Sequence, residues 1–274
     1  MPLGIKIRGV RGSIPTPGPE YLRFGGNTPC IEIRTPTDER LIFDAGSGIR
    51  ALGNSLTRDA AGAPIHANIF LTHFHWDHIQ GIPFFIPLFE ARNRISFFSG
   101  SSGLPLQEAI EGQMTKPYFP IHLDQVAAAR DFLQITDGDR FEIAGVTVRP
   151  FPLHHPQGAS GYRIESDGAA IVYATDYEPG DARLDDVLLE YADGADILIC
   201  DAQYTPETYG AHRGWGHGTW ENAVHVAAKA RVKKLLLFHH DPIHDDDMML
   251  HIASKAKKCF PHTEAAWEGF TATL

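Results

Sequence analysis

Four side chains that can bind a metal ion lie close together in one short segment of the sequence. The apolar run that begins at Ile69 leads into His73, His75, Asp77 and His78, which form the pattern His-x-His-x-Asp-His. A tight loop after a strand can turn alternate side chains into one pocket, so His73 and His75 can reach one cation. Asp77 and His78 can then reach a neighbouring one. Because imidazole nitrogen and carboxylate oxygen suit Zn²⁺, and also Mn²⁺ or iron, the segment predicts a metal site.

Further candidate ligands follow three later apolar runs. One run ends in the pair His154 and His155, one in Asp176, and one in the pair His239 and His240. Each signal alone is weak, because a lone histidine is more often a structural hydrogen-bonding residue and an aspartate after a strand is often a turn or a helix cap. Their common position after strands favours one shared site. The residues alone leave open which histidine of each pair takes part.

Elements that could position these side chains are visible in the hydrophobic pattern. Runs rich in Ile, Val, Phe and Leu, which mostly end at Gly, Pro or Asp, predict β-strands at residues 5–10, 30–34, 40–43, 68–72, 95–99, 141–151, 162–164, 170–174, 197–200 and 234–238. Helical patterns cover residues 104–113, 219–230 and 245–258. In the second helix, Ala223, Val226, Ala227 and Ala230 form a stripe that would face a core. Since strands and helices do not alternate strictly, we expect an α/β fold of two sheets with helices packed outside.

No linker divides the chain, so we expect a single domain over residues 1–274. Residues 12–26 are rich in Pro and Gly and predict a loop. Residues 103–123 carry Met114, Tyr118, Phe119 and Pro120 among polar residues. This segment could form a lid over a site or an ordinary surface helix with its connection.

Composition narrows the class of protein. The chain of 274 residues has 43% hydrophobic and 21% charged residues, which excludes a disordered or fibrous protein. A formal net charge of -10 argues against a general nucleic-acid coat and against binding to anionic membranes. Cys30, Cys200 and Cys259 form no CxxC pair. With neither a secretory signal nor a run of roughly 20 apolar residues, the sequence predicts a soluble cytoplasmic protein.

The His-x-His-x-Asp-His segment and the later candidates together resemble the metallo-β-lactamase superfamily. The resemblance implies an αββα four-layer sandwich of two mixed β-sheets, with a binuclear metal site along one edge. It favours His155 over His154 and His239 over His240. The implied first ion site is His73, His75 and His155, the second is Asp77, His78 and His239, and Asp176 bridges the two. This set contains no cysteine and so departs from the lactamases that use a thiolate ligand.

A second motif resembles one branch of that superfamily. The segment Gly216-His217-Gly218-Thr219, which opens a helix leading to His239, is similar to a loop in the tRNA 3′-processing endonuclease ribonuclease Z and its phosphodiesterase relatives. Gly218 stands where those enzymes have a serine. The resemblance implies that His217 donates a proton to the leaving group and that Asp201 orients it, with Asp77 also counted among the catalytic residues. Segments at residues 8–15, 24–30 and 43–48 also look like this branch, so the resemblance spans nearly the whole chain.

The implied reaction is hydrolysis of a phosphodiester by a hydroxide that bridges two divalent metal ions, with His217 as general acid. Ribonuclease Z enzymes carry an arm that grips tRNA between the third-segment histidine and the bridging aspartate. Here only 20 residues separate His155 from Asp176. We therefore expect a small substrate, such as a cyclic nucleotide or a cyclic ribose phosphate, rather than structured RNA. The resemblance also suggests a homodimer.

Other activities fit the same fold. The metal-activated hydroxide could attack the carbonyl of a lactone, a thioester or a β-lactam, although the His217 segment argues against acyl substrates. A ribonuclease of the ribonuclease Z kind, an oxygenase-type enzyme and a non-catalytic metal-binding protein are further alternatives. The complete ligand set with a candidate acid favours an active phosphodiesterase.

Overall fold

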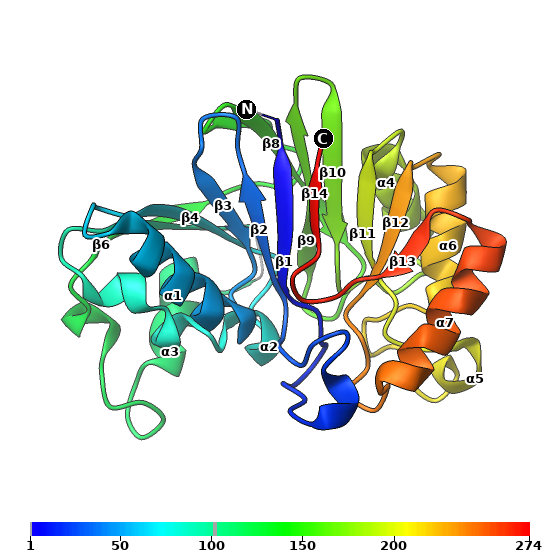
Figure 1. Ribbon diagram of the computed structural model, residues 1–274, viewed down its shortest axis with the longest axis horizontal. Helices are drawn as coiled ribbons and strands as arrows, with labels where there is room; N and C mark the ends of the chain where they lie inside the picture. The colour runs from blue at the N-terminus through cyan, green and yellow to red at the C-terminus, as the bar shows by residue number, and fades with distance from the viewer. Residues whose placement is uncertain (1, 101–102) are drawn as a thin grey trace.

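The computed structural model describes residues 2–100 and 103–274, and within them two mixed β-sheets of seven strands lie face to face (Figure 1). The first sheet has the order β14 (Thr271–Thr273), β1 (Gly4–Gly9), β2 (Cys30–Arg34), β3 (Arg40–Phe43), β4 (His66–Leu71), β5 (Arg94–Ser99) and β6 (Ala129–Gln134). The second has the order β13 (Thr263–Ala265), β12 (Lys234–Phe238), β11 (Ile197–Asp201), β10 (Ala169–Ala174), β9 (Ala159–Ser166), β8 (Val146–Leu153) and β7 (Phe141–Ile143). Each sheet contains both parallel and antiparallel pairs.

Helices cover the outer face of each sheet (Figure 1). On the first sheet lie α1 (Gly48–Ala60) and α3 (Leu106–Gln113), and on the second lie α4 (Ala182–Ala192), α6 (Trp220–Lys229) and α7 (Asp246–Cys259). The short helices α2 (Trp76–Ile79) and α5 (Pro206–Tyr209) lie at the lower edge of the sandwich in this view. The arrangement is the predicted αββα sandwich.

Successive side chains of a strand point to opposite faces of its sheet, and they fill three buried layers. One layer lies between the sheets, and one lies beneath the helices on each outer face. In β3, Leu41 and Phe43 face the core between the sheets, whereas Ile42 faces the outer core beneath α1. Phe43 stacks on Phe70 with ring centroids 5.0 Å apart, and Tyr162 packs against both rings. The packed layer between the sheets fixes the distance between the strand ends on which candidate ligands lie.

The helix predicted at residues 219–230 is α6. Ala223, Val226, Ala227 and Ala230 are buried in the core beneath the second sheet, as the apolar stripe predicts. The hydroxyl of Thr219 caps the helix by accepting a hydrogen bond from the Asn222 amide at 3.2 Å. The helix start is therefore fixed two residues after His217.

One strand prediction is wrong in its extent. The run at residues 141–151 forms two antiparallel strands, β7 and β8, rather than one. The chain reverses at Ala144 and Gly145, which have φ values of 53° and 76°. Glycine makes this conformation accessible, and apolar residues on both sides hide the turn in the hydrophobic pattern.

Residues 103–123 form a layer of the fold over the first sheet. Leu106, Ile110 and Met114 are buried against the outer face of this sheet, and Phe119 packs beside them. These contacts support the surface-helix alternative rather than a lid.

None of the helices in the described part of the chain combines the length and apolar character that crossing a bilayer requires.

Candidate metal centre

Strand direction explains why the candidate ligands meet at one edge. β10, β11 and β12 run parallel, so Asp176, Asp201 and His239 all lie at or just after carboxyl ends at the same edge of the second sheet. β8 is antiparallel to β9, which is antiparallel to β10, so His155 after β8 reaches that edge too. From the facing sheet, the loop after β4 brings His73 to the same place.

Four of the predicted ligands form one group. The ligand atoms of His73, His75, His155 and Asp176 all lie within 4.8 Å of one another. Nε2 of His155 lies 3.1 Å from Nδ1 of His75 and 3.8 Å from Oδ1 of Asp176. Nε2 of His73 lies 3.7 Å from the same carboxylate oxygen. These separations suit several ligands around one ion.

Asp77, His78 and His239 form an adjacent group. Oδ2 of Asp77 lies 3.3 Å from Nε2 of His78 and 3.1 Å from Nε2 of His239. Oδ2 of Asp176 lies 3.1 Å from Nε2 of His78 and 3.4 Å from Nε2 of His239. The Asp176 carboxylate thus turns one oxygen to each group, as a bridging ligand would.

The chemistry of this cluster fits divalent metal ions. Nε2 of His73 is buried and has no hydrogen-bond partner among the described residues. Burial holds the pKa of His73 well below its usual value, and the nearby His78 lowers it further, which favours the neutral imidazole that metals bind. An unpartnered buried nitrogen is costly in a folded protein unless an ion or a water completes it.

Neighbouring groups hold the imidazoles with their free nitrogen toward the cluster. Nδ1 of His78 lies 2.8 Å from a carboxylate oxygen of Asp44, and Nδ1 of His239 lies 2.8 Å from Oε1 of Gln203. Nδ1 of His155 donates to the Gly216 carbonyl at 2.9 Å. A hydrogen bond at Nδ1 of this kind leaves Nε2 as the metal-binding atom.

The structure separates the two competing histidines from the cluster. Nδ1 of His154 donates to the Glu178 carbonyl at 2.8 Å, and Nε2 of His240 donates to the Ala266 carbonyl at 2.8 Å. The His240 ring packs edge-on against Phe24. His155 and His239, not these two, are therefore the residues that join the candidate ligands.

His217 lies beside the cluster and is paired with Asp201. Its Nδ1 is 2.9 Å from Oδ2 of Asp201, a carboxylate that also accepts the Gly218 amide at 2.9 Å and the Asp176 amide at 3.1 Å. Burial opposes a charge on His217, but the Asp201 charge and hydrogen bond outweigh it and raise the pKa of His217 to about 9. With Asp176 and His239 it could also hold an ion. Its Nδ1, however, is occupied by Asp201.

The Gly-rich amino-terminal loop also reaches the cluster. The Ser13 amide donates to Oδ2 of Asp77 at 2.8 Å. A Cβ at Gly12 would lie 2.4 Å from Nδ1 of His239, so glycine permits this approach. A backbone amide is thus placed at the site.

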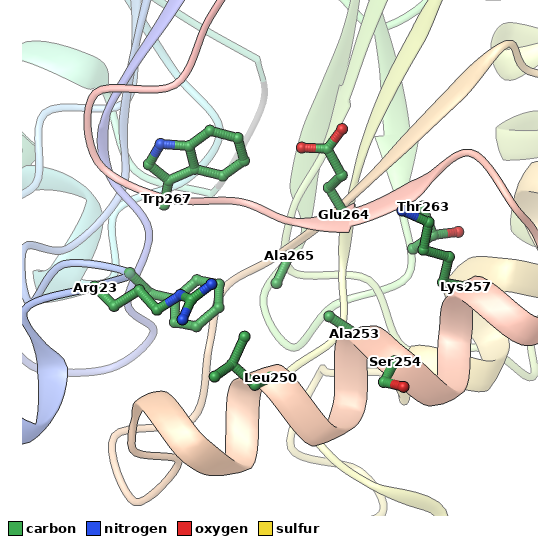
Figure 2. A pocket seen from close by; sticks show the side chains of 10 residues that line it. Arg23, Leu250, Ala253, Ser254, Lys257, Thr263, Glu264, Ala265 and Trp267 are labelled. Atoms are coloured by element: carbon green, nitrogen blue, oxygen red, sulfur yellow. The ribbon is translucent and has the colours of Figure 1, made fainter.

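Of two surface cavities, only one lies beside the ligand cluster. A groove of about 540 Å³ lies between α7 and β13, with Arg23, Leu250 and Trp267 among its lining residues (Figure 2). None of the candidate ligands lines this groove. A cleft of about 600 Å³ is lined by His155, Glu178, Tyr209 and Arg213, and so opens beside the cluster.

Comparison with known families identifies the fold. Residues 39–240 match the model of the β-lactamase superfamily domain. The chain belongs to the β-lactamase superfamily. Among superfamily relatives, the chain is 30% identical over 245 residues to the protein Rv1339 of Mycobacterium tuberculosis, covering 87% of this chain and 81% of Rv1339. It is 25% identical over 285 residues to ribonuclease Z of Natronomonas pharaonis, covering 87% of each.

Among solved structures of the superfamily, YhfI from Bacillus subtilis superimposes with a TM-score of 0.74 at 17% identity, over 100% of both chains. This likeness shows a common fold. Membership of the β-lactamase superfamily, the similarity to a ribonuclease Z and the His/Asp cluster together support a metal-dependent hydrolase.

Several supporting residues of this β-lactamase superfamily member carry no recognisable signal in the sequence. Asp44 lies in one of the Gly-containing segments, yet only the structure shows that it accepts hydrogen bonds from Thr72 and Tyr173 while contacting His78. Gln203 and Glu178 stand in unremarkable contexts. Their roles depend on contacts between segments far apart in the chain, which no local pattern reports.

Proposed function

We propose that this chain is a phosphodiesterase that uses two metal ions to hydrolyse a small phosphodiester, such as a cyclic nucleotide or a cyclic ribose phosphate. The observation that carries the proposal is the pair formed by His217 and Asp201 at 2.9 Å beside the ligand cluster. Phosphodiester cleavage expels an alkoxide, which is a poor leaving group without a proton donor. A positioned acid commonly accelerates such a step by about 10²- to 10⁴-fold.

The proposed ligands are the side chains of both groups. His73, His75 and His155 would hold one ion, Asp77, His78 and His239 the other, and Asp176 both. When bound, zinc, manganese or iron at these ligands would acidify a water and neutralise charge on the phosphoryl oxygens. Zinc suits the histidine-rich set best.

His217 would pass its proton to the leaving oxygen through Nε2. Because Asp201 holds Nδ1, the other ring nitrogen is the one free to exchange a proton with substrate. The Asp201 carboxylate raises the pKa of His217, which favours the protonated imidazole that a proton donor requires. Asp77 contributes as a ligand whose carboxylate also accepts the Ser13 amide.

A small substrate fits the surroundings of the site. Between His155 and Asp176 the chain forms β9 and β10, joined at Asp167 and Gly168 by a tight turn, which leaves no arm for gripping RNA. The cleft of about 600 Å³ beside His155 is of the size that small-molecule ligands occupy. Ribonuclease activity is the second candidate, favoured by the 25% identity to the Natronomonas pharaonis ribonuclease Z.

We also propose that residues 1–274 act as one domain in the cytoplasm. The cysteines at positions 30, 200 and 259 are all free, which fits a reducing compartment.

The test is a substrate panel on purified protein of measured metal content. Bis(p-nitrophenyl) phosphate and cyclic nucleotides should be hydrolysed, whereas an acyl-homoserine lactone and nitrocefin should react far more slowly. A precursor tRNA with a 3′ trailer tests the second candidate in the same panel. Faster hydrolysis of the lactone or nitrocefin than of every phosphodiester would contradict the proposal.

A further inference from the structure

Glu178 is a buried carboxylate that belongs to neither ion site. It follows Asp176 by two residues, and only 4% of its surface is exposed. It forms no ion pair with a described residue. Its oxygens instead accept the amides of Gly214 and Gly216, both at 2.7 Å, and the Tyr209 hydroxyl at 3.1 Å.

These donors lie in one loop and at the end of the helix before it. Tyr209 ends α5, and residues 210–219, here termed the acid loop, connect it to α6 and include His217. Three donors converge on Glu178, and an ionised carboxylate is the side chain that only accepts hydrogen bonds. A glutamine would turn an N–H₂ group toward at least one donor. A carboxylate at position 178 can therefore accept all three hydrogen bonds and so hold this loop in place.

The peptide group on one side of His217 links the loop to the proposed metal site. Gly216 donates its amide to Glu178, while its carbonyl accepts the Nδ1 hydrogen of His155 at 2.9 Å. Gly216 has a φ of 92°, and a Cβ there would lie 2.2 Å from Nδ1 of His155. The next residue along the chain is His217. A single anchored glycine thus contacts a proposed ligand and precedes the proposed acid.

We propose that Glu178 is a positioning residue for both parts of the site: by holding the acid loop it orients the imidazole of His155 and places His217 beside the leaving group. The part concerning His217 rests on the proposed function. The part concerning His155 concerns metal affinity alone and can be measured on protein without any substrate.

The experiment compares Glu178→Ala and Glu178→Gln with a control, Glu190→Gln, which alters an exposed carboxylate on α4. Zinc affinity is measured by competition with a chromogenic chelator. Hydrolysis is measured on two diesters that differ in leaving group, one releasing p-nitrophenolate and one releasing an alkoxide.

Glu178→Ala should weaken the ion site that His155 completes by about 10- to 100-fold, which is typical when a group that orients a ligand is lost. It should also slow alkoxide release at least about 10-fold more than p-nitrophenolate release, because only the poor leaving group needs the acid. Glu178→Gln should show a smaller shift in the same directions. Glu190→Gln should match the parent in both measurements.

Parent-like zinc affinity and a parent-like ratio of the two hydrolysis rates in folded Glu178→Ala would overturn the proposal. An equal loss on both diesters with unchanged zinc affinity would also overturn it, because that result describes a merely structural residue. If Glu178→Ala does not fold, the same criteria are applied to Glu178→Gln. If the parent cleaves neither diester, the proposed function fails, and zinc affinity still decides the role of Glu178.

Discussion

At the scale of single residues, His217 differs from His78 and His239 in the nitrogen that faces Asp176, because Nδ1 of His217 lies 3.8 Å from Oδ1 of that carboxylate. Its Nδ1 lies 2.9 Å from Asp201, whereas His78 and His239 contact Asp44 and Gln203 in the same way but direct Nε2 at Asp176. This difference separates a proton donor from a ligand. It leads to a prediction about the leaving group.

Replacing His217 with alanine should slow the release of an alkoxide by about 10²- to 10⁴-fold, while p-nitrophenolate release changes little. Metal content, measured by elemental analysis, should stay at the parent value because the seven proposed ligands are intact. His225→Ala, on the exposed face of α6, is the matched control and should keep the parent kcat on both substrates. Equal rates for His217→Ala and parent on both diesters would contradict the role of acid.

His240 provides a prediction about stability and pH. Burial, with Arg11 nearby, lowers the pKa of His240 to about 3, against about 6.5 for an unfolded histidine. Because the folded pKa is the lower one, the unfolded state binds the proton more tightly. The stability that the neutral His240 contributes to the folded state is fully present above about pH 6.5, and it is lost as the pH decreases toward 3.

In the variant His240→Gln this group no longer titrates. When the pH falls from 7 to 5, the free energy of unfolding of the parent should therefore decrease by about 2 kcal/mol more than that of the variant. Urea unfolding at both pH values measures the shift. Parallel pH profiles for the two proteins would show that His240 is not held neutral.

At the scale of elements, the acid loop contains two glycines that allow a controlled comparison. Gly214 and Gly216 have φ values of 87° and 92°, so alanine is strained to a similar degree at either position. A Cβ at Gly214 meets no atom within 4 Å, whereas a Cβ at Gly216 would lie 2.2 Å from Nδ1 of His155. Strain is common to both positions, and the positions differ in that a Cβ at Gly216 would clash with His155 and with Cδ of Pro156.

Gly214→Ala should cost about 1–2 kcal/mol of stability and lower metal affinity much less than Gly216→Ala, because no clash with His155 is added. Gly216→Ala should cost at least as much and also weaken metal binding about 10-fold or more, because His155 must move. Urea unfolding and chelator competition measure the two effects. Equal metal affinity in both variants would argue against the contact between the acid loop and His155.

Elements also show how far the sequence could predict this structure. The strands before His73, Asp176 and His239 were predictable, because each is a run of buried apolar residues that stops where a polar side chain is needed. The turn at Ala144 and Gly145 was not, since the apolar pattern continues across it. The short edge strands β13 and β14, of three residues each, carry too few apolar positions to show a period.

The candidate site was predictable to a different extent. His-x-His-x-Asp-His and the later strand ends identify groups that the structure brings together, because ligand chemistry restricts which residue types can serve. The choice of His239 over its neighbour is visible in contacts between distant segments, because Nε2 of His239 lies 3.1 Å from Asp77 whereas Nε2 of His240 donates to the Ala266 carbonyl. Asp44, Gln203 and Glu178 depend on contacts between distant segments, so only the folded chain reveals them.

At the scale of the whole molecule, the cluster joins the two sheets. His73 and His78 lie in the segment that follows β4 of the first sheet, and His155, Asp176 and His239 follow strands of the second. Bound ions would therefore link the two halves of the sandwich, and a ligand that binds only the folded state stabilises it. Without ions, the Asp77 and Asp176 carboxylates and the imidazoles stay buried together.

Removal of metal should accordingly lower the melting temperature. At an ion concentration about 1,000-fold above the dissociation constant, each bound ion contributes about 4 kcal/mol, which for a chain of this length corresponds to about 7 °C in Tm per ion, or about 14 °C for both. Scanning calorimetry with and without a chelator measures the shift, and added zinc should reverse it. Asp176→Ala removes the carboxylate that faces both groups, so the chelator should change the Tm of this variant by much less. A parent protein whose Tm is the same with and without chelator, after its metal content has been shown to fall, would contradict the view that ions at this edge hold the two sheets together.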